Sequence, residues 1–146
     1  MMNYTTTTEK ETKSLGEKLG KDLNLGEIVI LQGDLGSGKT TFTKGMAKGL
    51  GITEIITSPT FSLMNIYEYG ENSLIHIDTY RLENERDLLD IGIEDYLGKP
   101  NTITIIEWPE KIKNLLNKKM VTEITITHKN KNEREITASR KVYTLT

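Results

Sequence analysis

Gly33-Asp34-Leu35-Gly36-Ser37-Gly38-Lys39-Thr40 follows closely on the apolar run Ile28-Val29-Ile30-Leu31, and these two stretches define the architecture of the chain. A short apolar run bounded by glycine is typical of a strand buried on both faces of an α/β sheet. Residues 40–50 repeat apolar side chains at helical spacing up to Gly51, which predicts a helix. The turn between them has the pattern Gly, four residues, Gly-Lys-Thr, which predicts a phosphate-binding loop.

Each part of this loop suits a polyphosphate. The glycines allow backbone conformations that side chains forbid, so successive N–H groups turn toward one centre. The start of the helix adds the positive end of its dipole. Lys39 would reach the outer phosphates, and the Thr40 hydroxyl is a hard oxygen ligand suited to Mg²⁺. The alternative, a glycine-rich turn with an exposed lysine, is disfavoured by the strand and helix around the loop.

Helical and alternating patterns continue on both sides of the loop. Thr8 to Leu23 carries leucines at four-residue spacing, which predicts an amphipathic helix opened by a capping box of Thr8 and Glu11. Two strand-like segments, 61–67 and 73–78, flank the turn Gly70-Glu71-Asn72. They must pair antiparallel, because a parallel return needs a long crossover.

The second half of the chain completes a sheet. Thr102–Glu107 is another buried-type strand, and the alternating segments 121–128 and 133–138 predict a terminal hairpin. We therefore expect a single domain over residues 1–146. Its fold class is α/β, a phosphate-loop NTPase-like mixed sheet flanked by helices, with an antiparallel hairpin.

Two carboxylates end apolar strands and would face the loop. Asp78 follows Leu74-Ile75-His76-Ile77, and Glu107 follows Ile103-Thr104-Ile105-Ile106. A phosphate-loop enzyme needs such a carboxylate to hold Mg²⁺ or its waters, and ligands bind at the carboxyl ends of strands in α/β sheets. The more apolar Glu107 strand is expected to be the more central one. The alternative for either residue is an exposed acid at a strand end.

Three neighbours of these carboxylates have open roles. His76 lies on the same side of its strand as Asp78, and a hydrogen-bonded structural role is favoured over a catalytic one. Arg81 would either stabilise phosphate charge or pair with Glu83 or Glu85. Trp108, the single tryptophan, is expected to pack in the core.

The composition narrows the class of protein. The chain has 146 residues, of which 36% are hydrophobic and 27% charged, a globular balance without any cysteine for disulfides or thiolate metal sites. Its apolar runs are too short to span a bilayer, and the Thr-rich start lacks an apolar signal region, so we expect a cytoplasmic protein without membrane contact. Nineteen basic against 21 acidic side chains argue against direct tight binding of nucleic acid.

Four motifs together resemble one family. Gly33–Phe42, Ser58-Pro59-Thr60-Phe61, His76-Ile77-Asp78-Thr79-Tyr80-Arg81-Leu82 and Glu107-Trp108-Pro109 have the order and spacing of TsaE, the bacterial ATPase of tRNA threonylcarbamoyladenosine biosynthesis. The resemblance extends from the first helix to about Glu110. It implies an ATP·Mg²⁺ site, slow hydrolysis stimulated by a partner, and work with the TsaD and TsaB proteins. In that family TsaD transfers the threonylcarbamoyl group to adenosine 37 of tRNAs reading codons that begin with A.

The resemblance also implies roles for individual residues. Thr40 and Glu107 correspond to Mg²⁺ ligands, and Asp78 to a second acidic group that positions water or metal. We expect Asp78, Lys39 and Glu107 to form the catalytic set. Ser58–Phe61 resembles a switch segment whose Thr60 would sense the γ-phosphate. Thr12 and Arg134 are implied to lie near the adenine. The implied ATP-binding set is Thr12, Gly33, Asp34, Leu35, Gly36, Ser37, Gly38, Lys39, Thr40, Thr41 and Arg134.

Two other functions share the same loop. A small-molecule kinase would bring arginines over the transferred phosphoryl group, but the chain has only four arginines and no Arg-rich lid segment. A non-hydrolytic, nucleotide-gated interaction module would need binding but no turnover. The four motifs and the near-neutral charge favour an ATPase that resets a TsaD–TsaB complex and leaves the tRNA to those partners.

Overall fold

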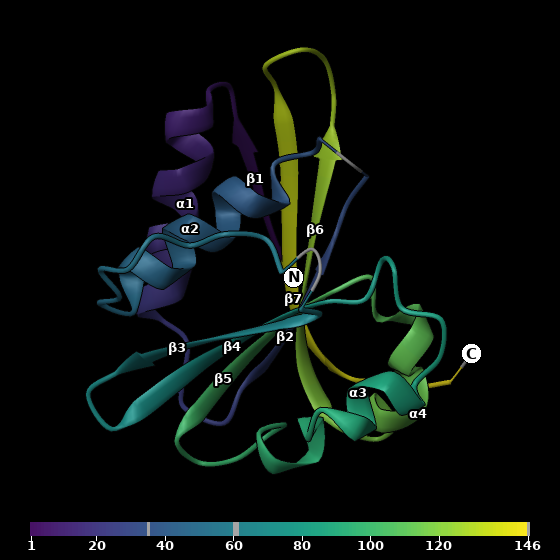
Figure 1. The fold of residues 1–146 in the computed structure, drawn as a ribbon. Helices are drawn as coiled ribbons and strands as arrows, with labels where there is room; N and C mark the ends of the chain where they lie inside the picture. The colour runs from purple at the N-terminus through teal and green to yellow at the C-terminus, as the bar shows by residue number, and fades with distance from the viewer. Residues whose placement is uncertain (35, 60–61, 146) are drawn as a thin grey trace.

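One mixed sheet forms the centre of the computed structural model (Figure 1), which describes residues 1–34, 36–59 and 62–145. Over these residues the sheet has seven strands in the order β1-β7-β6-β2-β5-β4-β3. The strands are β1 (Met2–Thr6), β2 (Ile28–Gln32), β3 (Met64–Tyr69), β4 (Asn72–Asp78), β5 (Thr102–Glu107), β6 (Met120–His128) and β7 (Arg134–Val142). The α/β class with a mixed, helix-flanked sheet is confirmed.

The centre of the sheet is parallel. β2 pairs in parallel with both β5 and β6, and β4 pairs in parallel with β5. Residues 28–31 of β2 are almost fully buried, which explains why this strand is apolar at every position. The expectation that the Glu107 strand is central is confirmed, because β5 lies directly beside β2.

Antiparallel strands close both edges. β3 and β4 form the predicted first hairpin, and β6 and β7 form the predicted terminal one. The outermost strand β1 pairs antiparallel with β7 and was not predicted. Only Thr6 of this strand is buried, so the strand has no alternation of apolar and polar residues. Because such alternation is the pattern that predicts a strand, the sequence does not indicate this one.

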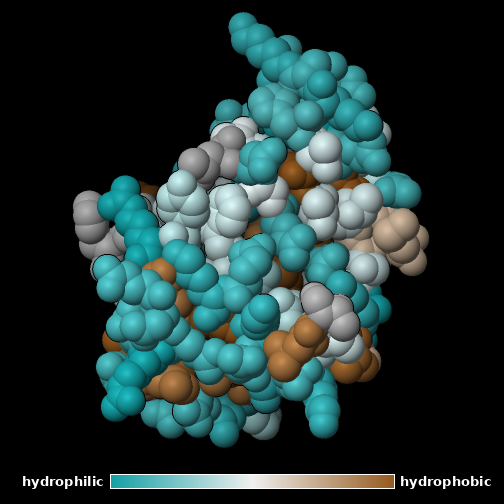
Figure 2. All heavy atoms as spheres, turned by 90° about the vertical axis from the view of Figure 1, so that its right-hand side faces the viewer, coloured by the Kyte–Doolittle hydropathy of each residue, from teal (hydrophilic) through white to brown (hydrophobic). Residues whose placement is uncertain are grey.

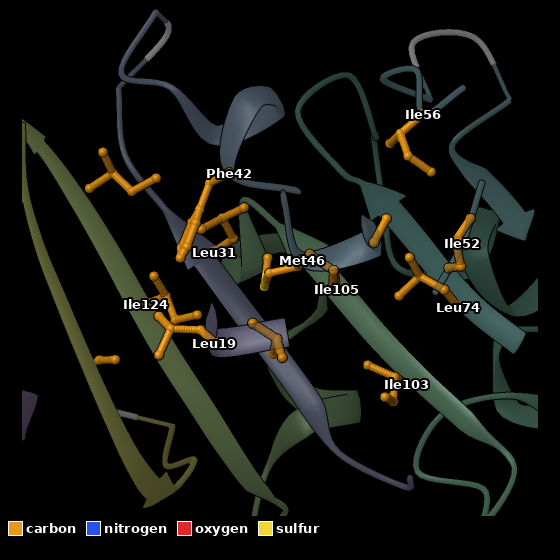
Figure 3. Close-up of a cluster of buried hydrophobic side chains, with 14 of the residues drawn as sticks. Leu19, Leu31, Phe42, Met46, Ile52, Ile56, Leu74, Ile103, Ile105 and Ile124 are labelled. Carbon is orange, nitrogen blue, oxygen red and sulfur yellow. The ribbon is translucent and has the colours of Figure 1, made fainter. Parts of the chain in front are cut away.

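Two helices cover one face of the sheet (Figure 1), α1 (Glu9–Lys21) and α2 (Lys39–Gly49). The Thr8 hydroxyl caps α1 by accepting a hydrogen bond from the Glu11 N–H, as predicted. The Glu11 carboxylate does not complete the predicted capping box with Thr8, because it accepts hydrogen bonds from the N–H and the hydroxyl of Thr7 instead. Phe42 and Met46 of α2 pack onto Leu31 and Ile105 of the sheet (Figure 3). This buried layer fixes α2, and therefore the loop before it, relative to the strand ends.

Short helices cover the opposite face: α3 (Arg86–Asp90), the 3₁₀ turns η1 (Ile93–Asp95) and η2 (Pro109–Ile112), and α4 (Lys113–Leu116). They pack on a second buried cluster that includes Ile30, Ile77 and Ile106. Seen from outside, this side of the molecule is mostly hydrophilic with separate apolar patches (Figure 2). Among the described residues, no helix combines the length and the apolar character that crossing a bilayer requires.

The register brings three strand ends together. Leu31 of β2 and Asp78 of β4 both lie opposite Glu107 of β5. Since these strands are parallel, their carboxyl ends share one edge of the sheet, and the loop after β2 opens onto the same edge. The site is built there.

Candidate functional site

The glycine-rich loop connects the end of β2 to the start of α2. Gly38 is the N-cap of α2 with φ 109° and ψ 16°, in the left-handed region that favours glycine, and it has no side chain to cap the helix. The first N–H groups of α2 therefore have no side-chain acceptor and face the loop. Such a helix start is a ready site for an anion.

Lys39 is buried at the first position of α2 with three partners around its ammonium. Its Nζ donates to the carbonyl oxygen of Gly33 at 2.7 Å and lies 3.9 Å from Oε1 of Glu107. The ring of Trp108 lies on another side, with its centroid 3.9 Å from Nζ. The ammonium thus contacts the loop, the carboxylate and the aromatic ring at once.

The environment lowers the pKa of Lys39 below its ordinary value of 10.5. Burial is the main cause, because it penalises the charged ammonium. The carboxylates of Glu107, Asp78, Asp34 and Glu110 act in the opposite direction but do not compensate. An anion bound beside Lys39 would supply the missing charge compensation.

The two candidate carboxylates differ in environment. Glu107 is buried, and its Oε2 lies 2.6 Å from Nε2 of His76. Asp78 is half-buried, with Oδ1 accepting the Tyr80 N–H at 3.0 Å and Oδ2 accepting the Ser58 hydroxyl at 3.5 Å. The hydrogen-bonded role expected for His76 is present, and Ser58 of the expected switch segment reaches Asp78.

A cavity of about 320 Å³ lies between the loop and the strand ends. It brings together residues of the glycine-rich loop, the start of α2, Ser58, and the ends of β4 and β5 with the residues that follow them. Its lining consists of Gly36, Gly38, Lys39, Thr40, Thr41, Ser58, Asp78, Tyr80, Glu107 and Trp108. All the expected catalytic and metal-binding residues are in this set.

A second cavity of about 280 Å³ lies on the other side of the loop. It shares Gly36, Gly38 and Thr41 with the first, and its remaining lining is Thr8, Glu9, Thr12, Lys131, Asn132 and Arg134. Arg134 of β7 donates from Nε to the carbonyl oxygen of Ser37 at 2.8 Å. Thr12 and Arg134, expected near the adenine, are therefore both placed against the loop.

Other expected residues lie at or beyond the border of the cavities. Gly33 and Ser37 belong to the loop but line neither cavity, and Asp34 is exposed. Arg81 is also exposed and outside both linings. Leu35, and Thr60 and Phe61 of the switch segment, lie outside the described residues.

Trp108 is placed differently from expectation. It is half-buried, lines the larger cavity and contacts Lys39 and Tyr80, so core packing was the wrong interpretation. Its φ of 60° lies outside the strand region, so the alternation of β5 does not continue to this residue. Tyr80 lies within one of the four motifs but was not singled out as a lining residue. The other missed lining residues are Thr8, Glu9, Lys131 and Asn132, and only their nearness in sequence to Thr12 or Arg134 could have indicated them.

Comparisons with known proteins identify relatives of this chain. The family model "Threonylcarbamoyl adenosine biosynthesis protein TsaE" matches residues 6–136. The tRNA threonylcarbamoyladenosine biosynthesis protein TsaE of Bacillus subtilis is 38% identical over 136 residues, covering 93% of this chain and 84% of the relative. The Treponema pallidum protein of the same name is 40% identical, covering 83% and 88%.

A solved structure is also similar. The crystal structure of Bacillus subtilis YdiB superposes with a TM-score of 0.78 at 33% identity, covering 97% of this chain and 85% of that one. A family match over most of the chain, relatives above 30% identity and a shared fold all point the same way. The chain belongs to the TsaE family of threonylcarbamoyl adenosine biosynthesis proteins.

Proposed function

We propose that this chain binds ATP with Mg²⁺ and hydrolyses it to support tRNA threonylcarbamoyladenosine formation. It acts on the TsaD–TsaB pair, which carries the tRNA and performs the transfer to adenosine 37, and it resets that pair between turnovers. The observation that carries the proposal is the convergence of Lys39, Asp78 and Glu107 on one cavity beside the glycine-rich loop. This arrangement suits phosphoryl transfer to water.

The donor set fits the nucleotide and its metal. The start of α2 offers N–H groups without a side-chain cap, and Lys39 adds a buried positive charge for the outer phosphates. Thr40 and Glu107 offer hard oxygens, as Mg²⁺ requires. The described residues hold no group of three or more His, Cys, Asp or Glu side chains that could hold a metal, so the phosphates would supply further ligands.

Each side chain then has a role in hydrolysis. Lys39 neutralises charge on the β- and γ-phosphates, and Mg²⁺ when bound supplies further charge neutralisation. Asp78, half-buried and anchored by the Tyr80 N–H, orients the attacking water. Thr12 and Arg134 hold the nucleoside side of ATP in the smaller cavity.

Turnover by the isolated protein is expected to be slow. No arginine is among the described residues that line the larger cavity, so a charge-stabilising group must come from elsewhere. A partner subunit can supply it. The same feature disfavours a small-molecule kinase, which would carry such arginines itself.

The test is a reconstitution with purified TsaB and TsaD and an unmodified tRNA. ATP hydrolysis and tRNA modification should both require the chain, and Lys39→Ala and Glu107→Ala should abolish both. Phosphate transfer to a small metabolite would instead support a kinase. Full tRNA modification with Asp78→Asn, or with a non-hydrolysable ATP analogue, would support a nucleotide-gated module.

A further inference from the structure

A buried histidine lies directly behind the proposed metal-binding carboxylate. His76 Nε2 is 2.6 Å from Glu107 Oε2, with the two side chains 0% and 4% exposed. His76 comes from β4 and pairs in register with Ile105 of β5, two residues before Glu107. Because side chains alternate along strands, His76, Asp78 and Glu107 point to the same face of the sheet.

The chemistry of the pair defines where the proton lies. An ionised carboxylate only accepts hydrogen bonds, so His76 must donate from Nε2. The other ring nitrogen, Nδ1, is buried and has no hydrogen-bond partner among the described residues. A proton on Nδ1 would be a buried donor without an acceptor, which costs more free energy than leaving Nδ1 unprotonated. The ring therefore takes the tautomer with its proton on Nε2.

The two oxygens of Glu107 are therefore divided between two tasks. Oε2 is engaged by His76, while Oε1 faces Lys39 Nζ at 3.9 Å on the side of the cavity. His76 itself does not line the cavity and cannot touch the nucleotide. It acts only through Glu107.

We propose that His76 is a positioning residue whose Nε2–H holds Glu107 in the orientation that leaves Oε1 available to Mg²⁺. The proposal rests on the proposed ATPase function. A carboxylate without this bond can rotate about its last torsion and present either oxygen to the metal. Losing a residue that orients a metal ligand typically lowers metal affinity roughly 10–100-fold. The bond should therefore tighten Mg²⁺ binding more than nucleotide binding.

The first test uses the nucleotide-free protein and needs no activity. The chain has two histidines, buried His76 and exposed His128, so two-bond ¹H–¹⁵N correlation spectra give one set of signals for each ring. We expect the Nε2–H pattern for His76, with a hydrogen-bonded Nε2 proton that is lost in Glu107→Gln. An Nδ1–H pattern, or signals unaffected by Glu107→Gln, would overturn the proposal.

The second test separates metal binding from nucleotide binding. His76→Leu should raise the Mg²⁺ concentration for half-maximal ATP turnover about tenfold, with less than a twofold change in Mg²⁺-free ATP affinity. His76→Gln, which retains an amide donor near the Nε2 position, should recover most of the difference. Equal Mg²⁺ requirements for wild type and His76→Leu, or no recovery with Gln, would contradict it.

A matched control removes general effects on the fold. Ile75→Ala alters the neighbouring residue of β4, which is fully buried in the cluster on the opposite face of the sheet. It should lower stability but leave the Mg²⁺ requirement unchanged, and an equal shift in this variant would count against a specific role for His76. If the wild type binds no ATP, the proposed function fails, while the tautomer spectra still report on the His76–Glu107 pair.

Discussion

Lys39 and Trp108 are in contact in the structure, with the lysine ammonium 3.9 Å from the centroid of the tryptophan ring. One residue begins α2 and the other follows β5. Thr79 supports the turn at Trp108 by donating its hydroxyl to the carbonyl oxygens of Glu107 and Trp108. The ammonium lies over the ring and donates one of its three N–H groups to Gly33, so a phosphate bound by Lys39 would change the charge beside the ring of Trp108.

Trp108 should therefore report nucleotide binding by its fluorescence. It is the single tryptophan of the chain, so its emission is not obscured by others. We expect a saturable change in emission when ATP is added, with a midpoint that equals the dissociation constant from calorimetry. The change should be absent in Lys39→Ala. An emission that stays constant at saturating ATP would contradict binding of the phosphates beside Lys39 and the ring.

ATP affinity should fall as the pH rises, and this fall should begin at a lower pH than the titration of an ordinary lysine. Burial lowers the pKa of Lys39 below 10.5, and the protonated form is the one that binds phosphate. Above the lowered pKa, each pH unit removes about nine-tenths of the remaining ammonium and raises the dissociation constant up to about tenfold. Calorimetry between pH 7.5 and 10 measures this, and Lys39→Ala should show a much flatter profile.

Gly45→Ala should destabilise the fold. A Cβ at Gly45 would overlap the Lys13 carbonyl of α1, because the two helices approach each other at Gly16, Gly20, Gly45 and Gly49. Separating them costs about 1–3 kcal/mol of unfolding free energy. Urea denaturation followed by circular dichroism measures it. Lys44→Ala, at the exposed neighbouring position, should stay within about 0.5 kcal/mol of wild type.

Arg134→Ala should weaken ATP binding. The bond from Arg134 Nε to the Ser37 carbonyl ties β7 to the phosphate loop, and the side chain also lines the smaller cavity. Losing one hydrogen bond between this side chain and the nucleotide costs about 1 kcal/mol, or about fivefold in affinity. Arg140→Ala, farther along β7 and away from the loop, is the control and should bind ATP as wild type does. Equal affinities for the two variants would exclude a role of Arg134 in the site.

Local patterns were sufficient for much of the fold and for the chemistry of the loop. The strand at Ile28–Gln32, the helix after Gly38 and the two hairpins follow from side-chain periodicity and turn residues within a few positions of one another. Asp78 and Glu107 were recognisable because each ends an apolar strand. The polar strand Met2–Thr6 was not, since pairing with β7 rather than its own side chains makes it a strand.

The remaining features depend on contacts between distant parts of the chain. Gly20 weakens the helical pattern locally, yet it is where α1 touches the backbone of Met46. His76 reaches Glu107 only through the register of β4 with β5, and Arg134 meets Ser37 across 97 positions. Trp108 faces Lys39 because its backbone leaves the strand conformation. Residue types and spacing identify the groups that carry the chemistry, but strand register and helix packing determine which of them meet.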